Sequence, residues 1–361
     1  MFTSKNVLLK KKQDDNLKSI NELKTNEHEN NLTKQSEEEI KLKEMKDKLK
    51  KHKFFGENFE LEKFLDSGSE SNVFKIKCKK NKKDYALKHI FNTKKGMKNI
   101  DEIKISSKLK NINVVDFFCY SPSKDDNSQF IIMENAKYGN LRNFQFKSLK
   151  RACLSESMLC FIAKQILNGL YYLHRCKIAH MDIKPQNIVI DDYLNAKIID
   201  FSISINYQGK KLSDKLKLPY KGTNFYMPLE VHNTQEIKYK DLNKVDAYAL
   251  GVLLYNLAFG YYPYGLTYED SYDYGKIIEK IKKEIEFKNE NNFSYHFIDF
   301  LSKLLEKDIN KRISIYEALE HHWVKGAKIL LDEKENLYNI NSFVVNLITD
   351  NIKKFNDYVK K

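Results

Sequence analysis

Polar residues around a short apolar hairpin constrain this chain more than any other feature of its sequence. Residues 187–190 and 196–199 are mainly apolar, and the Asp-Asp-Tyr-Leu-Asn segment between them begins and ends with turn-forming residues. This pattern predicts two short strands joined by a polar turn. Four polar residues are then expected to project from the loops beside the hairpin: Asp182, Lys184, Asn187 and Asp200.

These four residue types suit a phosphate group that is carried by a divalent metal ion. Carboxylate and amide oxygens are hard ligands of the kind that Mg²⁺ prefers, and a lysine ammonium offsets negative charge on a phosphoryl group during transfer. The simpler interpretation is a turn with ordinary caps and surface charges. The motifs elsewhere in the chain favour the phosphate site.

The residues around the hairpin resemble those of the eukaryotic protein kinase family. Residues 180–187 read His-Met-Asp-Ile-Lys-Pro-Gln-Asn, which is similar to the catalytic-loop motif H-R-D-L-K-P-x-N, and residues 200–202 read Asp-Phe-Ser, which is similar to D-F-G. The resemblance extends over about residues 55–325. It implies an α+β, two-lobed fold, in which a small lobe has an antiparallel sheet and one helix and a larger lobe is mainly helical.

The resemblance and the composition together suggest four segments. Residues 1–53 are rich in Lys, Glu and Asn, and we expect a largely disordered extension with a solvated helix over Glu37 to Lys53, since the repeat there is too short to support a coiled-coil arm. Residues 54–134 are expected to form the small lobe and 135–325 the large lobe. Residues 326–361 carry a candidate amphipathic helix, expected to pack on the large lobe, with an autoinhibitory or membrane-binding role as alternatives.

The glycine-rich loop of the family is only partly matched. In the motif G-x-G-x-x-G-x-V, Gly68 and Val73 match, whereas Asp66 and Ser71 stand where the first and third glycines are usual. Two alternating strands flank this loop, and the resemblance implies that the loop lies over the phosphates of a nucleotide. Taken alone, the segment is an ordinary hairpin.

The next strand and helix resemble the family's lysine and glutamate pair. Asp84–Ile90 is similar to the V-A-I-K strand, with Lys88 as the nucleotide lysine, and Glu102 on a helix over residues 99–110 is the expected partner of Lys88. The simpler interpretation of Glu102 is an exposed helix residue. Ser106 replaces a large apolar residue of the family, so we expect weak packing within the stack completed by Phe117, His180 and Phe201.

The resemblance also places residues around the adenine and ribose of ATP. Met133 is expected at the back of the pocket, the backbone of Glu134 and Ala136 at the base, and Asn140 near the ribose. The apolar residues expected to sandwich the adenine are Val73, Ala86 and Val189.

Residues 222–230 resemble the end of an activation segment, G-T-x-x-Y-M-A-P-E. Thr223 is typical of serine/threonine kinases, where it bridges the catalytic Asp and Lys, and Glu230 is expected to pair with Arg312. Asp246 is expected to anchor the catalytic-loop backbone. Met181 replaces the Arg that pairs with a phosphorylated activation loop in many kinases, so we expect activity that does not require such phosphorylation.

The implied reaction is transfer of the γ-phosphoryl group of ATP to a serine or threonine of a protein. In it Asp182 accepts the substrate proton, Lys184 steadies the phosphoryl group, and Asn187 and Asp200 hold Mg²⁺, with Mn²⁺ as a possible substitute. Amides at Asn140 and Gln186 replace the Glu residues that select upstream arginine, so a strong preference for basic substrates is not expected.

Composition limits the remaining possibilities. The net charge is +14 over 361 residues, but the lysines are spread along the chain, and no nucleic-acid motif is present. The five cysteines lack a C-x-x-C pair, which favours reduced thiols. No apolar run is long enough to span a membrane, and residues 1–5 lack signal-peptide and myristoylation features, so we expect an intracellular protein, cytoplasmic or nuclear.

Two other functions remain open from the sequence. A pseudokinase, which uses the same fold as a nucleotide-binding regulatory module or scaffold, is favoured by the sparse glycine loop, Ser106 and the Ser of Asp-Phe-Ser. A lipid or small-molecule kinase of related fold is disfavoured by residues 222–230 and by Arg312. A phosphate-transfer assay separates these alternatives.

Overall fold

The fold is described from a computed structural model that covers eight stretches of the chain: residues 36–68, 70–91, 100–123, 128–143, 154–218, 222–233, 236–287 and 293–326. The chain divides into two compact units. Unit 1 comprises Met1–Asn92 and Ser121–Ile131, and unit 2 comprises Thr93–Tyr120 and Ile132–Lys361. The helix expected within residues 326–361 lies almost wholly outside the described residues.

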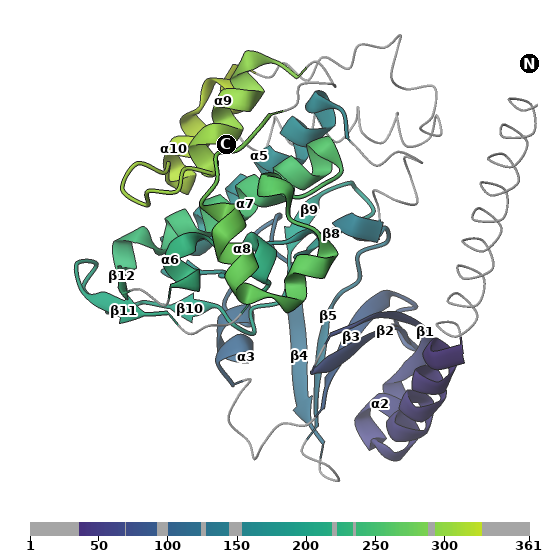
Figure 1. The fold of residues 1–361 in the computed structure, drawn as a ribbon. Helices are drawn as coiled ribbons and strands as arrows, with labels where there is room; N and C mark the ends of the chain where they lie inside the picture. The colour runs from purple at the N-terminus through teal and green to yellow at the C-terminus, as the bar shows by residue number, and fades with distance from the viewer. Residues whose placement is uncertain are drawn as a thin grey trace, which may run out of the picture. The chain divides into compact units, whose positions relative to one another are not determined.

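The strands of unit 1 belong to a five-stranded sheet with the order β1-β2-β3-β5-β4 (Figure 1). The boundary between the two units runs through the last two strands in this order. The strands are β1 (Phe59–Ser67), β2 (Ser71–Cys78), β3 (Asp84–Ile90), β4 (Phe117–Pro122) and β5 (Gln129–Glu134).

The two faces of this sheet carry different residues because successive side chains of a strand alternate. In the antiparallel β2–β3 pair, Val73 lies opposite Lys88, and Ala86 lies on the same face two residues before Lys88. Phe74 and Leu87, which also lie opposite each other, point to the other face and are fully buried. Val73, Ala86 and Lys88, which the sequence analysis assigns to a nucleotide, therefore share one face.

The opposite face of the sheet is covered by N-terminal helices, which corrects one expectation. Residues 36–51 form a helix, followed by α2 (Lys53–Asn58), and Met45, Leu49 and Phe55 are buried. Lys48 Nζ lies 3.1 Å from His89 Nε2 on β3. This helix is packed rather than solvated, because its few apolar residues fall on one stripe and each buried side chain stabilises the contact by about 2 kcal/mol.

Aromatic rings continue this contact across unit 1. The His52 ring lies 5.5 Å from Phe130 on β5, and the Phe130 ring stacks on His89 at 5.0 Å. The His52 Nε2 atom also lies 3.3 Å from the hydroxyl of Ser121 on β4. Residues of three strands thus hold the helices in place.

Two helices form the centre of unit 2. In α5 (Glu156–Arg175), apolar residues recur at helical spacing and Ser155 occupies the N-cap position. In α7 (Leu242–Phe259), buried residues lie on nearly every side, which is typical of a helix at the centre of a core. Gly260 ends α7 with a left-handed φ of 80°, a conformation that glycine adopts without steric cost.

Three small sheets frame the expected catalytic loop. The predicted hairpin is confirmed: β8 (Ile188–Ile190) pairs antiparallel with β9 (Ala196–Ile198). The Asp191 carboxylate accepts hydrogen bonds from the backbone N–H groups of Tyr193 and Asn195, which fixes the turn. The other strands of these sheets are β6 (Gly139–Asn140), which pairs with β8, β7 (Ile178–Ala179) with β10 (Ile205–Asn206), and β11 (Lys215–Lys217) with β12 (Glu236–Lys238).

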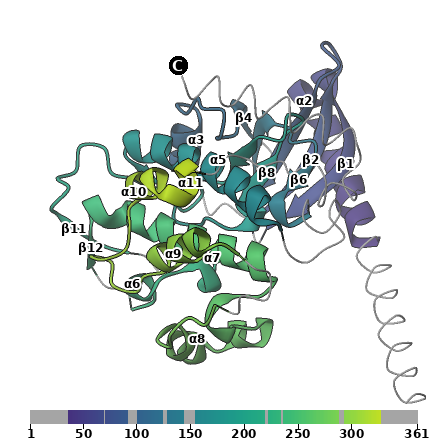
Figure 2. The same cartoon turned by 90° about the horizontal axis from the view of Figure 1, so that it is seen from above.

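The other α-helices of unit 2 complete its helical part. The helix predicted over residues 99–110 is shorter, α3 (Ile100–Ser106), and ends in turns. Further helices with described bounds are α6 (Leu229–His232), α8 (Tyr274–Ile281), α9 (Tyr295–Leu304), α10 (Ile315–Glu320) and α11 (His322–Gly326). The last two lie side by side (Figure 2). The antiparallel sheet of unit 1 and the helices of unit 2 confirm the α+β class.

No helix within the described stretches has both the length and the apolar character needed to span a membrane.

Close packing of α5 on β9 gives a first prediction. A Cβ atom on Gly169 would lie 2.8 Å from the carbonyl oxygen of Asn113 and 2.9 Å from Cδ1 of Ile198. We expect Gly169→Ala to lower the free energy of unfolding by about 1–3 kcal/mol, because the backbone contact cannot move aside. Urea denaturation of the purified chain measures this change.

The matched control is Gly275→Ala in α8. There the nearest atom to an added Cβ is the Asp273 carboxylate at 3.5 Å, an ordinary contact. Alanine is favoured over glycine within a helix by about 1 kcal/mol, so this variant is expected to be neutral or more stable than the wild type. Equal effects of the two substitutions would contradict the packing argument at Gly169.

Candidate active site

A buried carboxylate on α7 fixes the backbone of the loop between β7 and β8. Asp246 is fully buried, and its two oxygens accept hydrogen bonds from the backbone N–H groups of His180 at 2.9 Å and Met181 at 2.8 Å. The His174 ring contacts the same carboxylate at 2.7 Å. Burial disfavours the charged form, but the His174 hydrogen bond and charge, with His180, hold the pKa of Asp246 below its ordinary value.

These hydrogen bonds hold Met181 in an unusual backbone conformation. Its φ is 69°, in the left-handed region that side chains with a Cβ rarely adopt. The strained residue lies immediately before Asp182, and its N–H is one of the two groups that Asp246 binds. Such strain concentrates at functional sites, where surrounding contacts compensate for it.

The His180 ring joins the loop to the end of β9. Its Nε2 atom lies 2.9 Å from the carbonyl oxygen of Ile199, and its Nδ1 atom accepts a hydrogen bond from the Asp182 N–H at 3.3 Å. This pair of contacts fits the tautomer that carries its proton on Nε2. The His180 ring also meets Phe201 edge to face at 5.4 Å, which is one contact of the expected stack. Ser106, another member of the expected stack, is half-buried.

The side chains expected to be catalytic form one hydrogen-bonded cluster. The Thr223 hydroxyl donates to Asp182 Oδ1 at 2.9 Å and accepts from Lys184 Nζ at 2.8 Å. Lys184 Nζ also lies 2.7 Å from Asp182 Oδ2. Asn187 donates from Nδ2 to Asp182 Oδ2 at 2.9 Å and to the Asp182 carbonyl at 2.8 Å. The structure therefore brings Asp182, Lys184, Asn187 and Thr223 together.

This cluster has the charge and the exposure that a phosphoryl-transfer site needs. The side chains of Asp182 and Lys184 are 11% and 21% exposed, so the site is shielded and still reachable from solvent. A carboxylate that already accepts several donors is held in one orientation, with a cation beside it. Such an arrangement can orient a hydroxyl, and it offers positive charge to a group that develops negative charge during transfer.

The residues expected to hold a metal ion offer oxygen ligands. Because the Asn187 Nδ2 atom makes both hydrogen bonds described above, its Oδ1 atom is directed elsewhere. Asp200 follows β9 with a left-handed φ of 67°, and the Ser202 N–H lies 3.4 Å from its Oδ1. In the described part of the chain, no three His, Cys, Asp or Glu side chains form a metal-binding group. One carboxylate and one amide suit Mg²⁺, which commonly keeps water and phosphate ligands.

The residues expected to bind the nucleotide belong to both units. Met133, Glu134, Ala136, Asn140 and Val189 belong to unit 2, where Asn140 pairs with Val189 across β6 and β8. The residues in unit 1 are Gly68, Val73, Ala86 and Lys88. Gly68 lies in the β1–β2 turn, where its N–H donates to the Ser71 carbonyl at 2.7 Å. Lys88 and, in unit 2, Glu102 are both buried, and their pairing stays a prediction.

A lysine that the sequence analysis did not single out contacts the expected base-binding segment. Lys197 on β9 is buried, and its Nζ atom lies 3.0 Å from Glu134 Oε2 and 3.9 Å from Asp191 Oδ2. Lys197 also lies opposite Val189 in the β8–β9 pair. The ion pair fixes Glu134 against this hairpin. A single lysine in a short apolar strand was the only sequence signal for it.

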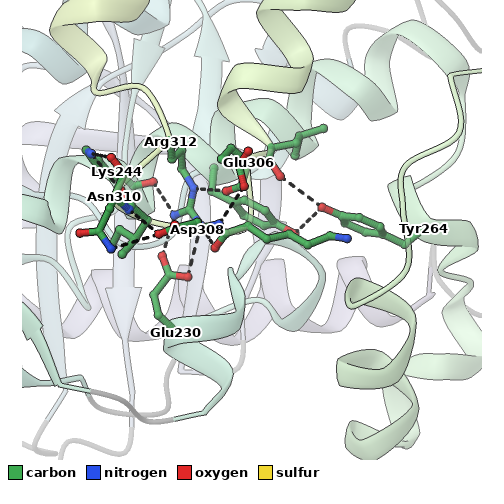
Figure 3. Close-up of polar contacts among 11 residues, drawn as sticks. Glu230, Lys244, Tyr264, Glu306, Asp308, Asn310 and Arg312 are labelled. Carbon is green, nitrogen blue, oxygen red and sulfur yellow. Dashed lines mark hydrogen bonds and ion pairs between the residues drawn. The ribbon is translucent and has the colours of Figure 1, made fainter.

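The predicted ion pair between Glu230 and Arg312 is confirmed (Figure 3). Arg312 donates from Nη1 to Glu230 Oε1 at 2.6 Å and from Nη2 to Oε2 at 3.2 Å, and it is almost fully buried. Its remaining N–H groups reach the carbonyl oxygens of Glu306, Lys244 and Lys307. The pair therefore ties the end of the activation segment to the loop before α10.

Met181 packs in an apolar cluster instead of presenting a cation to this segment. We call this group the activation cluster; its buried members are Ala179, Tyr207, Leu218, Met227, Val231, Ile237, Leu242 and Val245. Met181, Ile205 and Leu216 are partly buried against it. Residues before and after Thr223 thus pack on the catalytic loop through apolar contacts.

Comparison with known proteins gives matches to protein kinases. A family model described as "Protein kinase domain" matches residues 59–324. Calcium-dependent protein kinase 4 of Plasmodium berghei (strain Anka) is 30% identical over 314 residues, which cover 83% of this chain and 55% of that protein. Serine/threonine-protein kinase pakH of Dictyostelium discoideum is 31% identical over 277 residues, which cover 75% and 50%. The chain spans about half the length of these relatives.

Proposed function

This chain belongs to the protein kinase family, and on that premise we propose that it is an active serine/threonine kinase that uses Mg-ATP. The observation that carries the proposal is the position of Thr223, whose hydroxyl lies within hydrogen-bond distance of both Asp182 and Lys184. The Thr223 contact joins the activation segment to the proposed base, Asp182. A pseudokinase, which transfers no phosphate, has no need of such a contact.

We assign the chemical roles to side chains of unit 2. Asp182 orients the hydroxyl of the protein substrate and accepts its proton, while Lys184 stabilises negative charge on the transferring phosphoryl group. Asn187 and Asp200 are the residues that would hold Mg²⁺, which neutralises phosphate charge when bound. Thr223 keeps Asp182 and Lys184 in register with the activation segment.

Several features support a serine or threonine acceptor within a protein. Thr223 is followed by residues 224–230, which resemble the peptide-docking segment of protein kinases, and one relative is named a serine/threonine-protein kinase. The ion pair between Glu230 and Arg312 holds the last residue of that segment in place.

The cysteines bear on a different point, the compartment of the enzyme. Free thiols at Cys78, Cys119, Cys160 and Cys176 support the expectation of an intracellular enzyme.

The experiment is transfer of radiolabelled phosphate from γ-labelled ATP with Mg²⁺ to generic protein substrates, followed by phosphoamino-acid analysis. We expect label on serine and threonine. Nucleotide binding without any transfer would support the pseudokinase instead, and label on lipid or on a small molecule would support the other alternative. Replacing Mg²⁺ with Mn²⁺ tests the expected metal tolerance.

A further inference from the structure

The two-stranded sheet of β11 and β12 presents lysines on its outer side. Strand β11 alternates exposed Lys215, half-buried Leu216 and exposed Lys217, and β12 alternates exposed Glu236, buried Ile237 and exposed Lys238. In an antiparallel pair this alternation sends Leu216 and Ile237 to one face and the charged residues to the other. We call the outer side the basic face; three more exposed lysines, Lys210, Lys211 and Lys240, lie close to these strands in the sequence.

The basic face carries an excess of positive charge, and the repulsion between these charges destabilises the fold. Lys215 lies directly opposite Lys238, and like charges at such positions destabilise a sheet. The acidic residues of the described stretches 210–218 and 236–241 are Asp214, Glu236 and Asp241, and Glu236 lies 3.4 Å from Lys215 across two exposed side chains. These two stretches therefore hold six lysines and three carboxylates. A bound anion would relieve this repulsion.

The inner side of the same two-stranded sheet packs with a residue of the catalytic loop. Leu216 and Ile237 belong to the activation cluster, together with Met181, the residue before Asp182. Lys217 is six residues before Thr223, which limits their separation to about 20 Å even if the chain were fully extended. A peptide segment of about six residues can span the same distance, so acidic residues within about six positions of an acceptor held at Asp182 are close enough to reach the basic face.

We propose that the basic face binds acidic residues of the protein substrate that lie near its acceptor serine or threonine. This inference rests on the proposed function and adds a class of substrate to it. Lysines at an interface rim act through charge complementarity, so the contact strengthens substrate binding and weakens as salt is added.

The test uses three peptides with the same acceptor serine and with acidic, neutral or basic flanking residues. The wild-type chain is expected to favour the acidic peptide in kcat/KM and to lose that preference as salt rises. In the variant Lys217→Gln with Lys238→Gln, the ratio of acidic to neutral kcat/KM is expected to fall by about three- to tenfold, since each exposed charge pair contributes under about 1 kcal/mol. The loss is expected in KM.

The matched control is Lys282→Gln with Lys283→Gln, which removes two exposed lysines at the end of α8. Its ratio is expected to equal that of the wild type. The inference is overturned if the Lys217 and Lys238 variant has the same ratio as the wild type, or if the wild type prefers neutral or basic flanking residues. In either case, the observed phosphate transfer leaves the proposed function intact. Absence of transfer to all three peptides contradicts the proposed function instead.

Other polyanions are examined with the same variants. Duplex DNA and vesicles that contain phosphatidylserine are added separately to the wild type and to the Lys217 and Lys238 variant. If the substitutions weaken binding to either polyanion but leave the peptide ratio unchanged, the basic face recognises that polyanion and the substrate inference is overturned. A reduced ratio without such binding supports the inference.

Discussion

Replacing Asp182 with Asn is expected to lower the rate of phosphate transfer by about 10²–10⁴-fold, the usual contribution of a general base. An amide cannot take up the substrate proton. It also has one acceptor oxygen, whereas the Asp182 carboxylate receives Thr223 at one oxygen and Lys184 and Asn187 at the other. Steady-state transfer from γ-labelled ATP measures the loss.

Binding of Mg-ATP is expected to be nearly unchanged by this substitution, because we assign the metal ligands to Asn187 and Asp200. Calorimetric titration with a non-hydrolysable ATP analogue checks that point. The matched control is Asp192→Asn, the same chemical change at an exposed position in the β8–β9 turn. Transfer by Asp182→Asn at the rate of this control would refute the role given to Asp182.

Removing Glu230 is expected to cause the largest loss of stability among the ion pairs described. Glu230→Ala leaves the Arg312 guanidinium buried without its carboxylate, which typically costs about 3–5 kcal/mol of unfolding free energy. The midpoint of thermal unfolding should fall by roughly 10 °C for a unit of this size. Differential scanning calorimetry of the purified chain measures the shift.

Two further variants separate this effect from general damage. Glu320→Ala removes a pair with Lys325 whose side chains are half exposed, and it is expected to change stability by less than about 1 kcal/mol. Glu230→Leu combined with Arg312→Met removes both charges, so it should recover part of the loss seen in Glu230→Ala. A Glu230→Ala protein as stable as Glu320→Ala would contradict the account of the buried pair.

Local motifs allowed the catalytic loop to be predicted closely. The β8–β9 hairpin follows from two short apolar runs and a turn, which are neighbours in the chain. The Glu230–Arg312 pair joins residues far apart in sequence, and it was predicted only because both ends lie in segments that resemble family motifs. The roles of the individual site residues remain predictions, whereas the meeting of Asp182 with Thr223 is a property of the fold.

Other features depend on surfaces that periodicity alone does not identify. The stripe of Met45 and Leu49 is too sparse to indicate a partner, so packing of residues 36–51 on the sheet of unit 1 was not expected. The contact of Lys197 with Glu134 likewise requires the register of two strands. The basic face is visible only once β11 pairs with β12, because lysines spread through the sequence show no grouping by themselves.

The most direct test of the central claim is the rate of phosphate transfer by Thr223→Val beside Thr223→Ser. Valine keeps the shape of threonine but removes the hydroxyl that joins Asp182 to Lys184, and a hydrogen bond to a charged group contributes about 1.5–3 kcal/mol. The account predicts a kcat about 10- to 100-fold lower for the Val variant and near the wild-type value for the Ser variant. Wild-type kcat in Thr223→Val would contradict it.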